Sequence, residues 1–220
     1  MSNQIIIQSH KGEYSANFTR GGIDQLNNNP IENSVYIIDQ NIAQLYSSRL
    51  SNILSSRVLI IEAIEENKSL NQFPYYVNAL VQLNIRRGQT LVAIGGGIIQ
   101  DITCFLATTM MRGLPWIFYP TTLLAQSDSC IGSKSSINSG DVKNILGTFT
   151  PPINIIIDVD FLQTLKKKEI YSGVGEMIKV HAIDSPESFD KIAASYEELI
   201  IDFTTMEDFI YSSLLMKKKL

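Results

Sequence analysis

Short apolar runs alternate along the chain with longer segments of helical periodicity. The runs are rich in Ile and Val, and several are apolar throughout, as expected for strands that are buried on both faces. They cover residues 5–8, 35–39, 58–61, 90–94, 116–119 and 153–158. Between them, residues 41–53 carry apolar side chains at helical spacing, and 68–83 is a second helical segment that Pro74 would bend or start. This alternation predicts an α/β fold with a Rossmann-like parallel sheet and helices on both faces.

The pattern changes near residue 160. Strand signals end there, and two helix-like segments follow at 187–201 and 206–220. We therefore predict an α/β domain over residues 1–160 and the beginning of a mainly helical domain over residues 161–220.

Capping residues mark the two later helices. Ser185 before Pro186 is an N-cap followed by proline at the first helical position, and Thr205 with Asp208 forms a weaker capping box. The last segment carries no glycine stop signal, so we expect the helical domain to be incomplete in these 220 residues.

Composition narrows the class of protein. The chain is 45% hydrophobic and 18% charged, which is ordinary for a soluble globular protein. Its net charge of −4 argues against general nucleic-acid binding but allows a local cationic pocket. No apolar run approaches the ~20 residues of a membrane span, and the first residues lack the basic start of a secretory signal. Cys104 and Cys130 are expected to be reduced thiols, so we predict a cytoplasmic protein without membrane association.

A glycine turn carries the first chemical signal. Gly95, Gly96 and Gly97 directly follow the strand at 90–94 and precede a helix-like segment. Such glycines let a phosphate approach the backbone, and the helix N-terminus supplies N–H donors; a tight strand-to-helix turn is the alternative. Asp101, one turn later, would either favour the helix dipole or bind a ribose or nicotinamide group.

Two other strand ends carry polar residues. Asp39 ends the strand at 35–39 and Asn41 follows it, in a position to hold ribose hydroxyls or, equally, to form an Asx turn. Glu65 and Lys68 follow the strand at 58–61 and would touch the adenosine side of a dinucleotide or lie in a solvated turn.

A polar stretch follows the strand at 116–119. Its functional side chains are spaced through small residues: Thr121, Thr122, Asp128, Lys134, Lys143 and Asn144. The two threonine hydroxyls would face the crevice at the carboxyl ends of the strands, and Arg112 beside Gly113 would grip a phosphate with two hydrogen bonds. The alternative for the charged residues is a solvated loop.

Glu176 and Lys179 lie three residues apart and share a helix face. They are either a surface ion pair or a metal-binding carboxylate beside a substrate-binding ammonium group. Gly173 and Gly175, expected just before this helix, favour the second interpretation. His181 lies off that face and is expected to pack or to be on the surface. Catalytic zinc needs about three protein ligands, and the local sequence offers only Glu176.

Together these motifs resemble the 3-dehydroquinate synthase family of sugar-phosphate cyclases. The matching segments are Gly95-Gly96-Gly97 with Asp101, Met111-Arg112-Gly113, Pro120-Thr121-Thr122-Leu123-Leu124-Ala125-Gln126, Asp128-Ser129, Gly132, Lys134, Lys143-Asn144-Ile145-Leu146-Gly147 and Gly175-Glu176-Met177-Ile178-Lys179. Their order and spacing also fit, and the resemblance is strongest over residues 90–180. Gln100 and Ser133 stand where the family usually has glycine.

The resemblance implies roles for these residues. It implies NAD contacts at Asp39, Asn41, Glu65, Lys68, Gly95, Gly96, Gly97, Asp101, Thr121, Thr122, Lys143, Phe161 and Thr164. It implies substrate contacts at Arg112, Asp128, Lys134, Asn144 and Lys179, of which Asp128, Lys134 and Lys179 would be catalytic. Glu176 matches a ligand of zinc, or of cobalt in its place. Arg112 would reach the site of a partner subunit, which implies a homodimer.

The implied reaction is a lyase reaction of the shikimate pathway, on the way to aromatic amino acids. It converts 3-deoxy-D-arabino-heptulosonate 7-phosphate into 3-dehydroquinate and phosphate by transient oxidation with NAD, elimination, reduction and ring closure. Three alternatives are another sugar-phosphate cyclase such as a 2-deoxy-scyllo-inosose synthase, a polyol or glycerol-phosphate dehydrogenase, and a non-catalytic nucleotide-binding remnant. Family members supply two zinc-binding histidines from a later segment, so we expect these 220 residues alone to bind zinc poorly and not to turn over.

Overall fold

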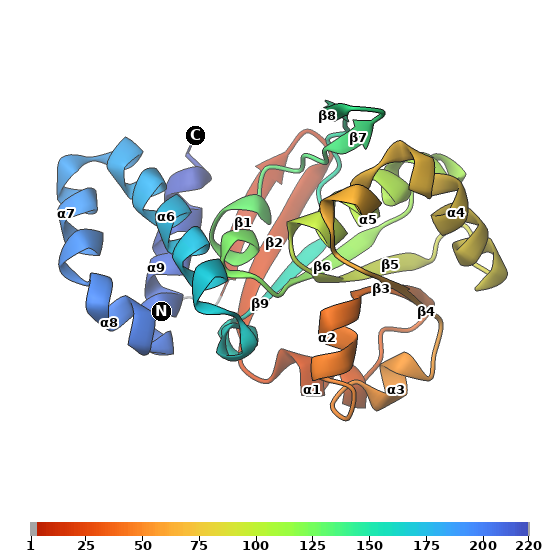
Figure 1. Ribbon diagram of the computed structural model, residues 1–220, viewed down its shortest axis with the longest axis horizontal. Helices are drawn as coiled ribbons and strands as arrows, with labels where there is room; N and C mark the ends of the chain where they lie inside the picture. Colours follow the sequence, from red (N-terminus) through yellow and green to blue (C-terminus); the bar gives the residue numbers. More distant parts are fainter. Residues whose placement is uncertain (1–3, 220) are drawn as a thin grey trace.

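The computed structural model describes residues 4–219 and centres on one seven-stranded sheet (Figure 1). The strands lie in the order β1 (Gln4–Ser9), β2 (Gly12–Thr19), β9 (Asn154–Asp158), β6 (Trp116–Pro120), β5 (Thr90–Gly95), β3 (Ser34–Asp39) and β4 (Val58–Ile61). Every neighbouring pair is parallel except β1 and β2. The six predicted strands are confirmed, and the parallel arrangement was wrong only for the strand at 5–8.

The antiparallel strand β2 was missed because it alternates. Tyr14, Ala16 and Phe18 are buried, while the residues between them are partly exposed. That pattern is typical of a strand with one face in the core, whereas continuous apolar runs mark strands covered on both sides. A separate hairpin of β7 (Ile137–Ser139) and β8 (Val142–Leu146) was missed as well, because both strands are short and neither has a continuous apolar run.

Helices cover both faces of the sheet (Figure 1). One face packs against α1 (Gly22–Asn28), α2 (Gln40–Leu45) and α3 (Ser51–Leu54), and the other against α4 (Phe73–Gln82) and α5 (Gly97–Thr109). Alternate side chains of β3 serve the two cores: Val35 and Ile37 face one, Tyr36 and Ile38 the other. The single helix expected over 41–53 is broken into α2 and α3, and Pro74 starts α4.

All elements after β9 are helical. A short 3-10 segment, η5 (Val159–Thr164), leads into α6 (Lys167–Asp184), α7 (Pro186–Ala194), α8 (Tyr196–Ile201) and α9 (Phe203–Lys217), which lie at one end of the sheet (Figure 1). The core on the α5 side of the sheet continues into these helices. The division into domains at residue 160 stays a prediction. Within residues 4–219, no helix combines the length and the apolar character needed to cross a membrane.

The starts of two helices, α6 and α9, differ from those predicted. Gly173 and Gly175 lie inside α6, because the helix already begins after Lys166, where the Glu169 carboxylate accepts a hydrogen bond from the Lys166 N–H at 3.0 Å. Ser185 caps α7 as predicted. The cap of α9 is Asp202, whose carboxylate accepts from two backbone N–H groups, and not the expected box at Thr205.

Candidate active site

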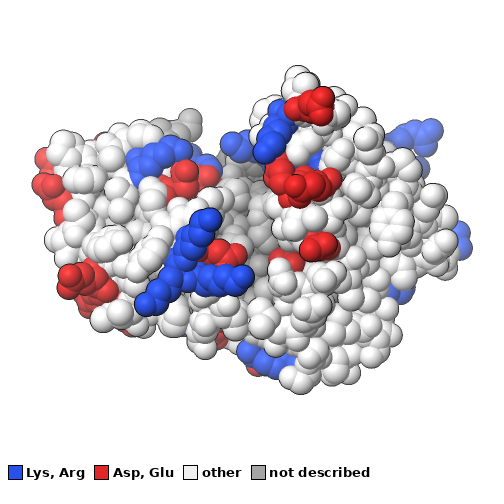
Figure 2. Space-filling view, viewed as in Figure 1, with Lys and Arg blue, Asp and Glu red and all other residues white. Residues whose placement is uncertain are grey.

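The order of the strands creates a crevice at the carboxyl ends of β3 and β5. The chain moves from β3 outward to β4, then returns to β5 and moves outward in the other direction to β6. Ligands of α/β proteins bind at such a switch point. Two cavities of about 410 and 440 Å³ open there, and Thr122 and Glu169 line both. Figure 2 shows the molecule hollowed between the helical end and the sheet, with side chains of both charges along the rims.

The glycine turn forms part of the wall of the first cavity. A Cβ atom on Gly95 would lie 2.5 Å from Cγ1 of Ile99, and one on Gly96 would lie 2.9 Å from Cγ2 of Thr122. The tight-turn interpretation therefore holds for these two glycines. Gly97 differs: it lines the cavity, with Ser129 Oγ 4.0 Å from its added Cβ as the nearest contact. Its backbone and the start of α5 are thus open to a ligand.

The second cavity is lined by five of the residues for which an NAD contact is predicted, but not by Glu65 or Lys68, the two predicted for the adenosine side. Asp39, Asn41, Thr121, Thr122 and Thr164 all contribute to its wall. Asp39 Oδ1 accepts a hydrogen bond from the Asn41 N–H at 2.9 Å, which confirms the Asx interpretation as a cap on α2. Burial raises the pKa of Asp39, and the nearby charge of Glu169 raises it further.

Phe161 does not line either cavity. Its ring is buried and packs edge-to-face on Tyr46, with 5.5 Å between ring centroids. The apolar ring therefore belongs to the core, and the predicted cofactor contact at Phe161 stays a prediction. The neighbouring Tyr46 hydroxyl lies 3.1 Å from Thr164 Oγ1 and so fixes a residue of the second cavity.

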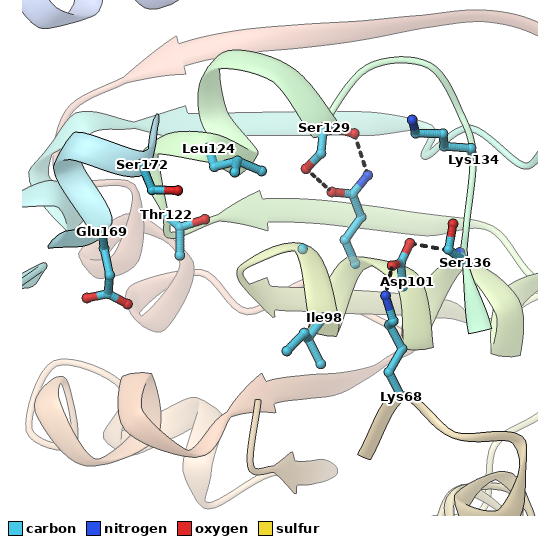
Figure 3. Close-up of a pocket in the computed structure, with 12 residues that line it drawn as sticks. Lys68, Ile98, Asp101, Thr122, Leu124, Ser129, Lys134, Ser136, Glu169 and Ser172 are labelled. Carbon is cyan, nitrogen blue, oxygen red and sulfur yellow. Dashed lines mark hydrogen bonds and ion pairs between the residues drawn. The ribbon is translucent and has the colours of Figure 1, made fainter. Parts of the chain in front are cut away.

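Lys68 joins residues from three segments at the end of the first cavity, and Figure 3 shows its contact with Asp101. Its Nζ donates to Asn144 Oδ1 at 3.0 Å and to Asp101 Oδ2 at 3.3 Å, and lies 3.5 Å from Glu65 Oε1. The residue is only 7% exposed, so the solvated-turn interpretation of Lys68 was wrong. Asp101 also accepts from the Ser136 N–H at 3.0 Å.

The pKa values of the two carboxyl groups beside Lys68 are shifted in opposite directions. Burial raises the pKa of Asp101, although the charge of Lys68 opposes the shift. Burial would raise the pKa of Glu65 too, but a hydrogen bond from Asn138 and the charge of Lys68 outweigh it, and the pKa is lowered. Lys143 adds to that lowering from an exposed position on β8, but it does not line either cavity.

Asp128 lies in a π-helical turn, η4 (Ala125–Ser129), and pairs with a residue that the sequence did not reveal. Lys217 Nζ at the end of α9 lies 2.5 Å from Asp128 Oδ1 and 2.7 Å from its carbonyl oxygen. Lys134 lines the first cavity from an exposed position.

Glu176 and Lys179 form an exposed ion pair at 2.9 Å, as the surface interpretation expected. The hydrogen bond and charge of Glu176 raise the pKa of Lys179, and the charge of Asp128 adds to the shift. Among residues 4–219, no three His, Cys, Asp or Glu side chains come together to hold a metal ion. These residues do not by themselves fit zinc, so no step is assigned to a metal.

Two further residues lie away from the cavities. Arg112 lies in η3 (Met110–Arg112), at the far end of α5 from the glycine turn, and does not line either cavity of this chain. Its predicted contact in a partner subunit stays a prediction. His181 is buried, with Nδ1 2.8 Å from Ser188 Oγ and its ring against Phe209, which confirms the packing interpretation.

Sequence reasoning missed Glu169 and gave no role to Gln100. Glu169 lines both cavities, and its spacing from Lys166 is a capping-box signal that could have placed the start of α6. Gln100 also lines the first cavity and binds Ser129 twice: its Nε2 donates to the carbonyl oxygen at 2.5 Å, and its Oε1 accepts from Oγ at 2.7 Å. Gln100 thus ties α5 to η4.

Comparisons with known proteins match this architecture. The chain is 38% identical over 159 residues to a 3-dehydroquinate synthase of Alkaliphilus metalliredigens, covering 71% of this chain and 45% of that protein. It is 37% identical over 172 residues to a 2-epi-valiolone synthase of Actinosynnema mirum, covering 76% and 45%. The chain therefore spans about half the length of these curated relatives.

A solved structure shows the same fold. The 2-epi-5-epi-valiolone synthase from Streptomyces hygroscopicus subsp. jinggangensis 5008, with NAD+ and Zn2+ bound, superposes with a TM-score of 0.83 at 24% identity, covering 94% of this chain and 60% of that one. The family model described as 3-dehydroquinate synthase N-terminal matches residues 58–172, which include the glycine turn and the residues that line the first cavity. Because this match covers more than half of the chain, the chain belongs to the 3-dehydroquinate synthase family.

Proposed function

We propose that the chain is the cofactor-binding part, with some of the substrate site, of an NAD-dependent sugar-phosphate cyclase. The proposed reaction converts 3-deoxy-D-arabino-heptulosonate 7-phosphate into 3-dehydroquinate and phosphate. The observation that carries the proposal is the pair of cavities at the switch point, where Gly97, Asp39 and Thr122 from three strand ends converge in a member of this family. We further propose a cytoplasmic homodimer, to whose second site Arg112 contributes.

The two cavities offer the groups that a dinucleotide requires. The backbone at Gly97 and the start of α5 would hold the pyrophosphate, and Asp39, with one carboxylate oxygen in its cap, would accept from ribose hydroxyls. Bound there, NAD would accept and return a hydride. Asp101 would orient the nicotinamide end, and Lys68 balances its charge within the low-dielectric site.

The chain's own charged side chains would orient an anionic substrate. Lys134 at the first cavity and Lys179 on α6 would bind phosphate or carboxylate oxygens, and Asn144 would hydrogen-bond a hydroxyl. Asp128, which Lys217 contacts from α9, would accept a hydrogen bond or a proton from a substrate hydroxyl. The relatives' metal would need ligands in addition to Glu176.

A second cyclase reaction is supported by one specific observation. The 3-dehydroquinate synthase and the 2-epi-valiolone synthase are almost equally similar, at 38% and 37% identity. In a protein that also carries the later segment with the zinc-binding histidines, release of phosphate from sedoheptulose 7-phosphate but not from the heptulosonate would favour this candidate. Net accumulation of NADH would instead indicate a dehydrogenase, because a cyclase regenerates its cofactor.

Calorimetric titration with NAD+ tests the cofactor proposal on the chain itself. We expect saturable binding that weakens at least about tenfold in Asp39→Ala, equivalent to about 1.4 kcal/mol. The control is Asp190→Ala, which removes an exposed carboxylate on α7 and should leave the affinity unchanged. No binding at millimolar NAD+, or equal weakening in both variants, would contradict the proposal.

A further inference from the structure

A single buried amide connects the two halves of the proposed site. Asn138 on β7 is 7% exposed, and its Nδ2 donates to Glu65 Oε1 at 2.8 Å. Its Oδ1 accepts from the Asn144 N–H at 2.8 Å. Both ends of one side chain are therefore used, one toward a proposed cofactor contact and the other toward a proposed substrate contact.

Two more links hold the β7–β8 hairpin in the same place. The backbone of Asn138 pairs with that of Ser69 in an isolated bridge, directly after the 3-10 segment η1 (Glu65–Lys68). Lys68 Nζ reaches Asn144 Oδ1 at 3.0 Å and Glu65 Oε1 at 3.5 Å. The hairpin is thus bound to η1 by hydrogen bonds that include the side chains of both Glu65 and Lys68.

Asn144 depends on this support. Its φ of 55° lies in the left-handed region, which a residue other than glycine adopts with some strain and keeps where its surroundings hold it. Here Asn138 holds its backbone N–H and Lys68 holds its side-chain oxygen. A ligand that engages Glu65 or Lys68 must compete for the bonds that define the position of Asn144.

We propose that Asn138 is a positioning residue that couples the binding of NAD at Glu65 and Lys68 to the placement of Asn144. The inference rests on the proposed function, since it takes Glu65 and Lys68 as contacts of NAD and Asn144 as a contact of the sugar phosphate. Cofactor that engages Glu65 shifts the Asn138 amide, and the amide moves the hairpin that carries Asn144.

Asn138→Asp isolates this link. The substitution is nearly isosteric and keeps an acceptor for the Asn144 N–H, but it places a carboxylate against Glu65 where a donor had been. The matched control is Asn71→Asp in η2 (Leu70–Gln72), which makes the same charge change at an exposed side chain with no hydrogen bond among the described residues.

Backbone amide exchange, followed by NMR on the labelled chain with and without saturating NAD+, is the measurement. In the wild type and in Asn71→Asp, NAD+ should change the exchange rates of hairpin amides, including Asn144, at least fivefold. In Asn138→Asp, the Asn144 amide should exchange at least tenfold faster without ligand and should no longer respond to NAD+. Exchange in the central strand β5 should be unchanged.

A pH series separates this role from a general packing defect. Near pH 4, close to the ordinary aspartate pKa of about 3.9, the introduced carboxyl group becomes partly protonated and can donate to Glu65 again, so the difference from the wild type should shrink. A packing defect would persist at both pH values. Asn138→Ser, which removes both amide bonds without adding charge, should also free the Asn144 amide, and serves as the test if Asn138→Asp does not fold.

The outcomes separate the two proposals. If the wild type does not bind NAD+, the proposed function fails, and the coupling inference fails with it. If the wild type binds NAD+ but the Asn144 amide exchanges and responds alike in the wild type, Asn138→Asp and Asn138→Ser, only the inference is overturned.

Discussion

Two glycines on one helix predict opposite effects of the same substitution. Gly173 and Gly175 both lie inside α6. A Cβ atom on Gly173 would lie 2.6 Å from Cβ and 2.9 Å from Cδ2 of Leu123, and would contact Cγ still more closely. Leu123 is fully buried, so it has no free space to move into. A Cβ atom on Gly175 meets nothing within 4 Å. We therefore expect Gly173→Ala to destabilise the fold and Gly175→Ala to stabilise it.

The magnitudes follow from two opposing terms. Replacing glycine by alanine inside a helix stabilises it by about 1 kcal/mol, and Gly175→Ala should realise most of that gain. Gly173→Ala has the same gain but adds overpacking against Leu123, which typically costs about 1–3 kcal/mol. The free energies of unfolding of the two variants should therefore differ by about 1–3 kcal/mol.

Urea denaturation, followed by circular dichroism, measures this difference. With a slope of about 3 kcal/mol/M, the unfolding midpoints of the two variants should be separated by about 0.3–1 M, with Gly175→Ala the higher. Equal midpoints, or a higher midpoint for Gly173→Ala, would refute the claim that close packing against Leu123 requires glycine at position 173. A changed slope would instead indicate a change in the compactness of the native or unfolded state.

Three further predictions concern ionisable groups. Burial raises the pKa of Asp39, so its ionised form destabilises the fold at neutral pH. Asp39→Asn keeps the helix cap, and it should raise the free energy of unfolding at pH 7. Urea titrations should show that this gain is lost near pH 4. Burial lowers the pKa of His181, so the unfolded chain binds a proton at a higher pH than the folded chain does. The free energy of unfolding should therefore fall as the pH drops below about 6.5. His181→Gln should make this fall less steep, and an equally steep fall in the variant would contradict the prediction. A double-mutant cycle of Asp128→Asn and Lys217→Met should give a coupling of about 1–3 kcal/mol in the free energy of unfolding. The reason is that both side chains are three-quarters buried or more. Additive effects of the two substitutions would show that the pair contributes nothing.

The strands could be predicted because burial on both faces leaves a strong local signal. The central strands β3, β5 and β6 have such apolar runs and are covered by helices on both sides. All six runs are strands, although the edge strands β1 and β4 expose Ile6 and Ile60 on one face. The signal weakens where one face is polar, as in β2, and where a hairpin lies outside the main sheet, as in β7 and β8. Helix boundaries were predicted less well, since the start of α6 depends on a cap formed by Glu169.

The candidate site was predicted in part, and topology explains which part. Asp39 ends β3, and Gly97 and Thr122 lie two residues after β5 and β6. The carboxyl ends of neighbouring parallel strands meet at one edge of the sheet. No further tertiary information is needed to bring them together. Lys217 and Asp128, by contrast, are 89 residues apart on elements whose mutual position depends on the packing of α9.

The same distinction explains why Lys68 was underestimated. A lysine between polar residues at the end of a strand has the local pattern of a solvated turn, and nothing nearby in sequence indicates its burial. Its partners Asp101 and Asn144 lie 33 and 76 residues away, and they reach it only after α5 and the β7–β8 hairpin have packed. A buried ammonium group requires such partners. The packing that forms the cavity therefore also determines which residues in its wall can carry a charge.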